Sequence, residues 1–204
     1  MNFTDTYKTI QDSSKGLYKE KGSRFIAHAF MVKTEEEVKG KLAILRKEYH
    51  DARHHCYAYR LGFEKSIYRI NDDGEPSGTA GRPIYNQILS NDLTQILIVV
   101  IRYFGGIKLG VPGLINAYKS ATFDALEHAT IITKTVTEEY LVEFDYAAMN
   151  SIMKALKDEQ AAILSQGFEH LCILHFSIRK SLGMKIVSRL QKIPNVSVVL
   201  QCEF

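Results

Sequence analysis

The segment Ile96–Ile101 constrains the fold more than any other, because it places six apolar residues in a row with no polar residue between them. A strand with one face in water alternates apolar and polar side chains, whereas a strand covered on both faces is apolar throughout. This segment is therefore predicted to be a central strand of a sheet with structure packed on both faces. It ends at Arg102, which two aromatic residues and the glycine pair Gly105-Gly106 follow.

The sequence around this strand predicts a mixture of strands and helices. Thr34 and Glu37 form a capping box, which predicts a helix from residue 35 onward. Pro112-Gly113 is predicted to open a second helix with a broad apolar face, and a short helix is expected at 84–89. Strand character is found at 16–18, 23–30, 54–61 and 66–70, the last two forming a hairpin.

The threonine-rich segment Thr130–Thr137 is the expected boundary between two domains, which we place at residues 1–134 and 135–204. The second domain is predicted to run strand, helix, strand, strand, helix, strand. Its segments are 139–144, 147–158, 162–165, 170–178, 182–190 and 196–200. This is the order of a ferredoxin-like βαββαβ sandwich, which about 70 residues can fill, so the predicted fold class is α+β.

Composition argues against several classes of protein. With 46% hydrophobic and 24% charged residues, the chain has the balance of a soluble globular protein. Cys56, Cys172 and Cys202 share no short spacing, so neither a disulfide framework nor a four-thiolate zinc site is expected, and a reducing cytoplasm is the expected location. No signal peptide and no apolar run of about 20 residues is present, so we expect no membrane association.

Charge is unevenly divided between the two expected domains. Residues 1–134 hold 19 Lys and Arg against 15 Asp and Glu, whereas 135–204 hold 7 against 8. A polyanionic partner is therefore expected to prefer the first domain.

The glycine-rich segment after the apolar strand has the position of a ligand site, because it follows a buried strand and precedes a helix whose backbone amides attract anions. The spacing of Gly105, Gly106, Gly110 and Gly113 matches neither the dinucleotide fingerprint nor the phosphate loop. These glycines also fit a purely structural role, in which two segments pass closely. Arg102 either pairs with an acid of the 72–75 loop or contacts an anion, and both interpretations stay open.

A metal site or a hydrolytic site is the alternative that residues 53–60 and 72–75 suggest. Strand alternation turns His54 and Cys56 to one face and His55 and Tyr57 to the other, so only one histidine can reach any one centre. The preferred interpretation of the Asp-Asp-Gly-Glu run is a turn, because Asp and Gly are turn-forming residues. A pair of catalytic carboxylates is the second interpretation. We predict no metal and no cofactor.

A single-stranded nucleic acid is held by cations that meet its phosphates and aromatic faces that meet its bases. The residues that could provide such a surface are Arg53, Arg60, Arg82, Arg102, Lys108 and Lys119, with Tyr57, Tyr59, Tyr103 and Phe104. Scattered surface arginines and core aromatics are the alternative interpretation.

Three motifs closely resemble those of the IMPACT/YigZ family. They are DDGEPSGTAGRP at 72–83, VVIRYFGGIKLG at 99–110 and HHCYA at 54–58. The resemblance covers nearly all of residues 15–130, and residues 135–204 are similar to the small domain appended in bacterial members.

The resemblance implies an N-terminal α/β sandwich like the second domain of ribosomal protein five of the small subunit and the fourth domain of elongation factor G. It implies a ferredoxin-like C-terminal domain, and RNA or the ribosome as partner. Eukaryotic relatives regulate translation in the stress response to amino-acid starvation, largely through an additional N-terminal domain, so their mechanism is not transferred. No established catalytic residues come with the family.

We therefore expect a non-enzymatic, translation-associated binding protein of undetermined oligomeric state. Its expected nucleic-acid-binding residues are Arg60, Arg82, Arg102, Tyr103, Lys108 and Lys119. The family-motif residues expected at the same surface are Asp72, Asp73, Gly74, Glu75, Gly81, Gly105, Gly106 and Gly110. One alternative is a metal-assisted hydrolase that uses the acidic loop and His54 or His55. Another is a module that regulates translation by binding an acidic protein partner without contacting RNA.

Overall fold

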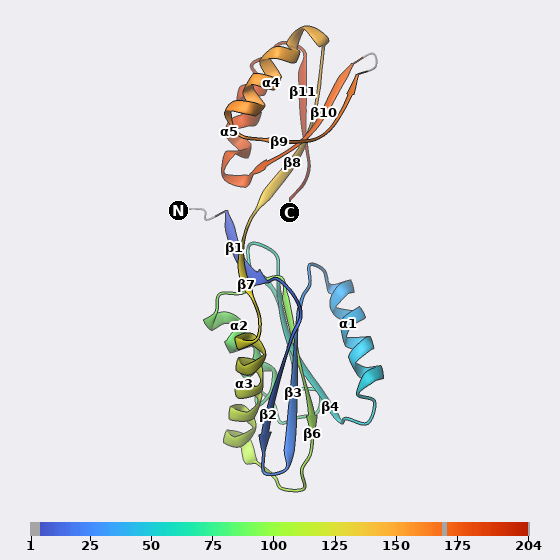
Figure 1. Cartoon of the computed structure of the whole chain (residues 1–204), viewed down its shortest axis with the longest axis vertical. Helices are drawn as coiled ribbons and strands as arrows, with labels where there is room; N and C mark the ends of the chain where they lie inside the picture. The colour runs from blue at the N-terminus through green and yellow to red at the C-terminus, as the bar shows by residue number, and fades with distance from the viewer. Residues whose placement is uncertain (1–4, 169–170, 204) are drawn as a thin grey trace. The chain divides into compact units, whose positions relative to one another are not determined.

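The computed structural model describes residues 5–168 and 171–203, which form two compact units. The N-terminal unit is Lys8–Thr133, and the C-terminal unit combines the residues before Lys8 with those from Lys134 onward. The chain passes between the units in β1 (Thr6–Ile10) and in β7 (Ile131–Thr135), and these two strands pair with each other (Figure 1). None of the helices described is long and apolar enough to cross a membrane.

The N-terminal unit is built on a five-stranded antiparallel sheet with the order β2-β3-β6-β4-β5. The strands are β2 (Ser14–Glu20), β3 (Ser23–Met31), β4 (His54–Leu61), β5 (Ile67–Asn71) and β6 (Ile96–Tyr103). The central strand β6 is buried from Ile96 to Arg102. The position that the unbroken apolar run predicts for this strand is confirmed.

Helices cover both faces of this sheet. Helix α1 (Glu35–Glu48) packs on one face, and α2 (Gly81–Ser90) and α3 (Gly110–Glu127) lie on the other (Figure 1). Successive residues of β6 serve the two faces in turn, as Val99 belongs to the α1 side and Val100 to the α2/α3 side. This is why both kinds of position are apolar.

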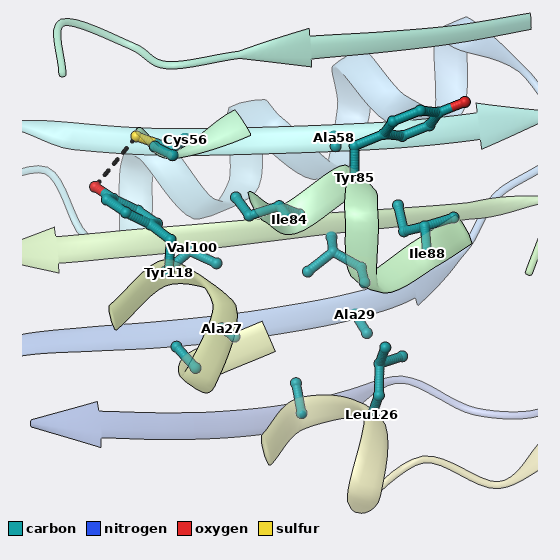
Figure 2. Packing of buried hydrophobic residues seen from close by; sticks show 14 of the residues in the cluster. Ala27, Ala29, Cys56, Ala58, Ile84, Tyr85, Ile88, Val100, Tyr118 and Leu126 are labelled. Atoms are coloured by element: carbon teal, nitrogen blue, oxygen red, sulfur yellow. Dashed lines mark hydrogen bonds between the residues drawn. The ribbon is translucent and has the colours of Figure 1, made fainter. Parts of the chain in front are cut away.

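The larger core lies between the sheet and helices α2 and α3. On the sheet it uses small side chains such as Ala27 and Ala58, and the helices contribute larger ones such as Ile84 and Tyr118 (Figure 2). Small residues on the strands let the helices approach closely. One such close approach is at Gly16 on β2, where an added Cβ would overlap the backbone of α3.

The C-terminal unit follows the order β8 (Thr137–Phe144), α4 (Met149–Asp158), β9 (Ala162–Phe168), β10 (Cys172–Arg179), α5 (Lys180–Leu190) and β11 (Val196–Glu203). Its four strands are antiparallel in the order β11-β8-β10-β9. The strand-helix-strand-strand-helix-strand order expected from the sequence is present. The first residue of the strand expected at 170–178 lies outside the described residues.

Some boundaries differ from expectation for identifiable reasons. The segment expected as a link is largely strand, since β7 and β8 occupy 131–135 and 137–144, and β1 was not predicted. Helix α2 begins at Gly81 rather than at the predicted residue 84. Its first amides are capped by the side chain of Asp72, which is distant in the sequence, so no residue beside the helix indicates where it starts. Helix α1 begins as predicted, with Thr34 Oγ1 accepting from the Glu37 amide at 3.2 Å.

Candidate functional site

A cavity of about 460 Å³ lies where the central strand β6 ends. Its walls come from Arg53 and His54 at the start of β4, from the acidic loop at Glu75, and from the segment between Arg102 and Leu114. We call this cavity the β6-end pocket. The sequence motifs at 54–58, 72–83 and 99–110 all contribute to it, although they are separate in the chain.

The first acid of the loop caps a helix. Asp72 Oδ1 accepts from the amides of Ala80 and Gly81 at 3.0 and 2.8 Å, and Oδ2 accepts from the Gly78 amide at 2.9 Å. Amides at the start of a helix have no intrahelical partner, so a carboxylate there stabilises the helix. Both oxygens of Asp72 are therefore used in positioning α2.

The second acid fastens the loop to its surroundings. Asp73 Oδ2 accepts from the His55 amide at 2.7 Å, and Oδ1 lies 3.2 Å from Arg46 Nη2. The Asp73 carbonyl accepts from His54 Nδ1 at 2.8 Å. Asp73 and Gly74 have φ angles of 41° and 87°, which gives the run the turn geometry that its composition indicates.

The third acid forms a buried ion pair. Glu75 Oε1 lies 2.6 Å from Arg102 Nη1, and the two side chains are 4% and 8% exposed. The Tyr118 hydroxyl donates to the same oxygen at 2.8 Å. Of the two interpretations of Arg102, the structure shows the pairing with an acid. A direct contact with an anion stays a prediction.

A thiol extends this buried network without becoming reactive. Cys56 Sγ lies 3.3 Å from the Tyr118 hydroxyl (Figure 2) and 3.0 Å from the Asp72 carbonyl. Burial raises the pKa of Cys56 and of Tyr118 well above their usual values. A thiol that stays protonated is a poor nucleophile, so the network fixes Arg102 in place and supplies no attacking group.

Arg102 also has contacts that the ion pair does not use. Its guanidinium carbon lies 5.5 Å from the ring centroid of Phe25 and 5.7 Å from that of Phe104. Its Nε–H is buried and has no hydrogen-bond partner among the described residues. A buried donor without an acceptor is costly, by about 1–3 kcal/mol.

Two cations line the pocket, and two further expected binding residues are exposed on the helices α2 and α3. Arg53 and Lys108 line the β6-end pocket, and Lys108, Arg82 on α2 and Lys119 on α3 are exposed. Within residues 5–168 and 171–203, no acid forms an ion pair with any of these four side chains.

Two of the expected binding residues are engaged elsewhere. Arg60 pairs in register with Ile96, at the opposite end of β6 from Arg102, and six strand residues span about 20 Å. Its Nη1 lies 3.7 Å from Asp92 Oδ1. Tyr103 donates its hydroxyl to Asp51 at 2.6 Å, and Arg24 lies over its ring at 4.8 Å. The structure does not bring Arg60 to this surface.

The glycines permit close approach and unusual backbone angles. A Cβ at Gly105 would overlap the backbone of Gly22 and Ser23, and the Gly105 amide donates to Ser23 Oγ at 3.1 Å. Gly106 and Gly110 have φ angles of 90° and 71°, which favour glycine. The glycine-rich segment is thereby held against the β2–β3 turn.

An exposed apolar strip was missed by the sequence analysis. Phe104, Ile107 and Val111 are each more than half exposed, and Ile115 follows one turn later on α3. The spacing from Val111 to Ile115 was the available signal, since residues four apart share one side of a helix. It was hidden because the same helix also has a broad buried face.

Known proteins resemble this chain over most of its length. A family model described as the Impact N-terminal domain matches residues 21–126. The IMPACT family member YvyE of Bacillus subtilis is 36% identical over 155 residues, or 76% of this chain and 71% of YvyE. The IMPACT family member YigZ of Escherichia coli is 34% identical over 160 residues, or 78% of each chain. A crystal structure described as a hypothetical protein matches with a TM-score of 0.72 at 27% identity, over 97% of this chain and 98% of the other.

Proposed function

Because this chain belongs to the IMPACT family, we propose that it is a translation-associated binding protein that contacts RNA, free or on the ribosome, in the cytoplasm. The contact surface is the β6-end pocket with its cations Arg53 and Lys108, and Arg82 and Lys119 are further expected contacts. The observation that carries this proposal is that Arg53 and Lys108 line the pocket beside the exposed Phe104, and that no acid among the described residues is paired with either cation.

The positions of the acids favour a binding protein over a hydrolase. Metal-assisted hydrolysis needs carboxylates that are free to hold a metal or move a proton. Asp72 and Asp73 have both oxygens occupied by donors of the protein, and Glu75 Oε1 holds Arg102 and Tyr118. In the described part of the chain, no three His, Cys, Asp or Glu side chains are grouped as metal ligands.

The architecture is compatible with a partner in the translation machinery. We infer that the N-terminal unit is a sandwich of the ribosomal-protein and elongation-factor type, and that the C-terminal unit is ferredoxin-like. The strand order β11-β8-β10-β9 and the alternation of strands and helices support the second assignment. A fold does not give a function by itself, so the proposal rests on the surface.

The test is a salt series of binding to single-stranded RNA, duplex RNA and ribosomes. The informative variant is Arg53→Gln with Lys108→Gln, which removes two free cations and leaves the ion pair of Arg102 intact. The matched control is Arg69→Gln with Lys192→Gln, two exposed cations that do not line the pocket.

We expect wild-type affinity to fall steeply with salt. For single-stranded RNA, loss of two phosphate contacts should reduce the slope of log affinity against log salt by about 1.4, whereas the control should keep the wild-type slope. Absence of binding to RNA and ribosomes near physiological salt would exclude the proposal. Equal slopes for the pocket variant and the control would place any contact elsewhere.

A second candidate is docking of a protein partner, which the exposed strip of Phe104, Ile107, Val111 and Ile115 favours. Association with ribosomes that survives RNase treatment but is lost in Ile107→Asp would favour this alternative. Association lost on RNase treatment favours RNA.

A further inference from the structure

We propose that the β6-end pocket binds one unpaired nucleotide, with the base against Phe104 and the phosphate against Lys108 and Arg53. This inference rests on the proposed RNA contact and goes further, because it names the form of RNA that the site selects. A single strand with an unstacked base fits the pocket, whereas an intact duplex does not.

The size and the walls of the pocket suit a base. Small-molecule pockets typically measure about 300–1,000 Å³ and are mostly apolar with a few polar groups, and this cavity of about 460 Å³ lies within that range. Pro76, Leu109, Val111 and Leu114 provide apolar wall, and Phe104 provides an aromatic face.

Phe104 is a preorganised stacking platform. The residue is 56% exposed, so part of its ring is accessible, and the guanidinium of Arg102 lies 5.7 Å from the ring centroid. Arg102 is itself held by Glu75, and the next residue, Gly105, is fixed by the Ser23 side chain. Stacking on aromatic rings is how proteins hold the bases of single strands.

The phosphate has donors at the same pocket. No acid in the described part of the chain forms an ion pair with Lys108 or Arg53, and helix α3 begins at Gly110 with no side-chain cap and no acid in its first turn. Amides at such a helix start attract anions. The buried Nε–H of Arg102 has no hydrogen-bond acceptor among the described residues. An acceptor atom of a bound ligand would satisfy it.

The acid in the pocket does not repel a phosphate strongly. Glu75 is only 4% exposed, and its Oε1 already accepts from Arg102 and Tyr118. The remaining charge of the pocket is therefore positive. A base that stays paired inside a duplex cannot present its face to Phe104, which is why an unpaired nucleotide is required.

The experiment compares one RNA sequence as a single strand and as a blunt duplex, with 2-aminopurine as a fluorescent base in the single strand. Binding is measured for the wild type, for Phe104→Ala and for Phe123→Ala. Phe123 is a matched control, because it is 52% exposed on α3 and does not line the pocket.

We expect the single strand to bind more tightly than the duplex, with a change in 2-aminopurine fluorescence on binding. Phe104→Ala should weaken single-strand binding about tenfold and abolish the fluorescence change, leaving the salt slope unchanged, while Phe123→Ala behaves as wild type.

Two results would overturn the inference in different ways. If single strand and duplex bind equally and Phe104→Ala changes neither affinity nor fluorescence, the nucleotide pocket is wrong while the RNA proposal stands. If neither RNA binds near physiological salt, the proposed function is wrong as well.

Discussion

The buried ion pair of Arg102 and Glu75 should be essential for the stability of the N-terminal unit. Its side chains are only 8% and 4% exposed, so the small energies of surface pairs do not apply. Removing one partner leaves the other charge buried, which costs about 3–5 kcal/mol. We therefore expect Arg102→Met or Glu75→Leu, each alone, to lower the free energy of unfolding by about that amount.

The double variant Arg102→Met with Glu75→Leu should lose less stability than the two single variants added together, because no unpaired charge remains. Urea unfolding gives the free energies, and hydrogen exchange of the β6 amides reports on the N-terminal unit alone. Tyr118→Phe is a graded control that removes the contacts of its hydroxyl with Glu75 and Cys56 but no charge, and it should cost about 1–2 kcal/mol.

Two results would refute this reasoning. Single variants that cost less than about 1 kcal/mol would show that the pair is not desolvated in solution. A double variant whose cost equals the sum of the single costs would show that the two charges are not coupled.

Four further predictions follow from other contacts. Asp72→Ala should cost about 1–2 kcal/mol through loss of the α2 cap, measured by urea unfolding. Gly105→Ala should cost at least about 1–3 kcal/mol and lower the Tm, because its Cβ would overlap the backbone of the β2–β3 turn. Burial lowers the pKa of His28 from 6.5 to about 4, so the unfolded chain binds more protons between these values. Stability should therefore fall as pH falls from 6.5 to 4, and less so in His28→Gln. In native protein Cys56 should react with thiol reagents at pH 8 much more slowly than Cys202, as mass spectrometry can show, because Cys56 is buried whereas Cys202 is partly exposed.

Each of these predictions has an outcome that contradicts it. Asp12→Ala removes an exposed acid that caps no helix, so an equal loss in Asp12→Ala and Asp72→Ala would argue against the cap. An unchanged Tm in Gly105→Ala would mean that the two turns can separate. Identical pH profiles for wild type and His28→Gln would assign the acid sensitivity to other groups. Modification of Cys56 at the rate of an unfolded thiol would show that its burial is transient.

The parts of the fold that were predicted are those with a local signal. The unbroken apolar run gives β6 its central position, and the capping box of Thr34 and Glu37 gives α1 its first residue. Strand β1 has no such signal, because its partner β7 lies about 120 residues away in the sequence. The start of α2 was missed because its cap stands nine residues before it.

The candidate site was predicted in its segments but not in its details. Sequence alone cannot decide whether Arg102 meets an acid or a ligand, since that depends on where the loop folds back. Sequence alone also cannot show that Arg60 lies far from the pocket, because this depends on the length of β4 and on its register with β6. Tyr103 and Phe104 are neighbours in the chain, yet Tyr103 is tied to Asp51 while Phe104 is exposed.

The pairing of β1 with β7 has a consequence for synthesis of the chain. Residues 6–10 are synthesised well before their partner at 131–135, which does not exist until about 120 further residues have been added. At about 5–20 residues per second this interval lasts roughly 6–25 s. All five strands of the large sheet are complete by residue 103, so this sheet can form while β1 still waits for its partner.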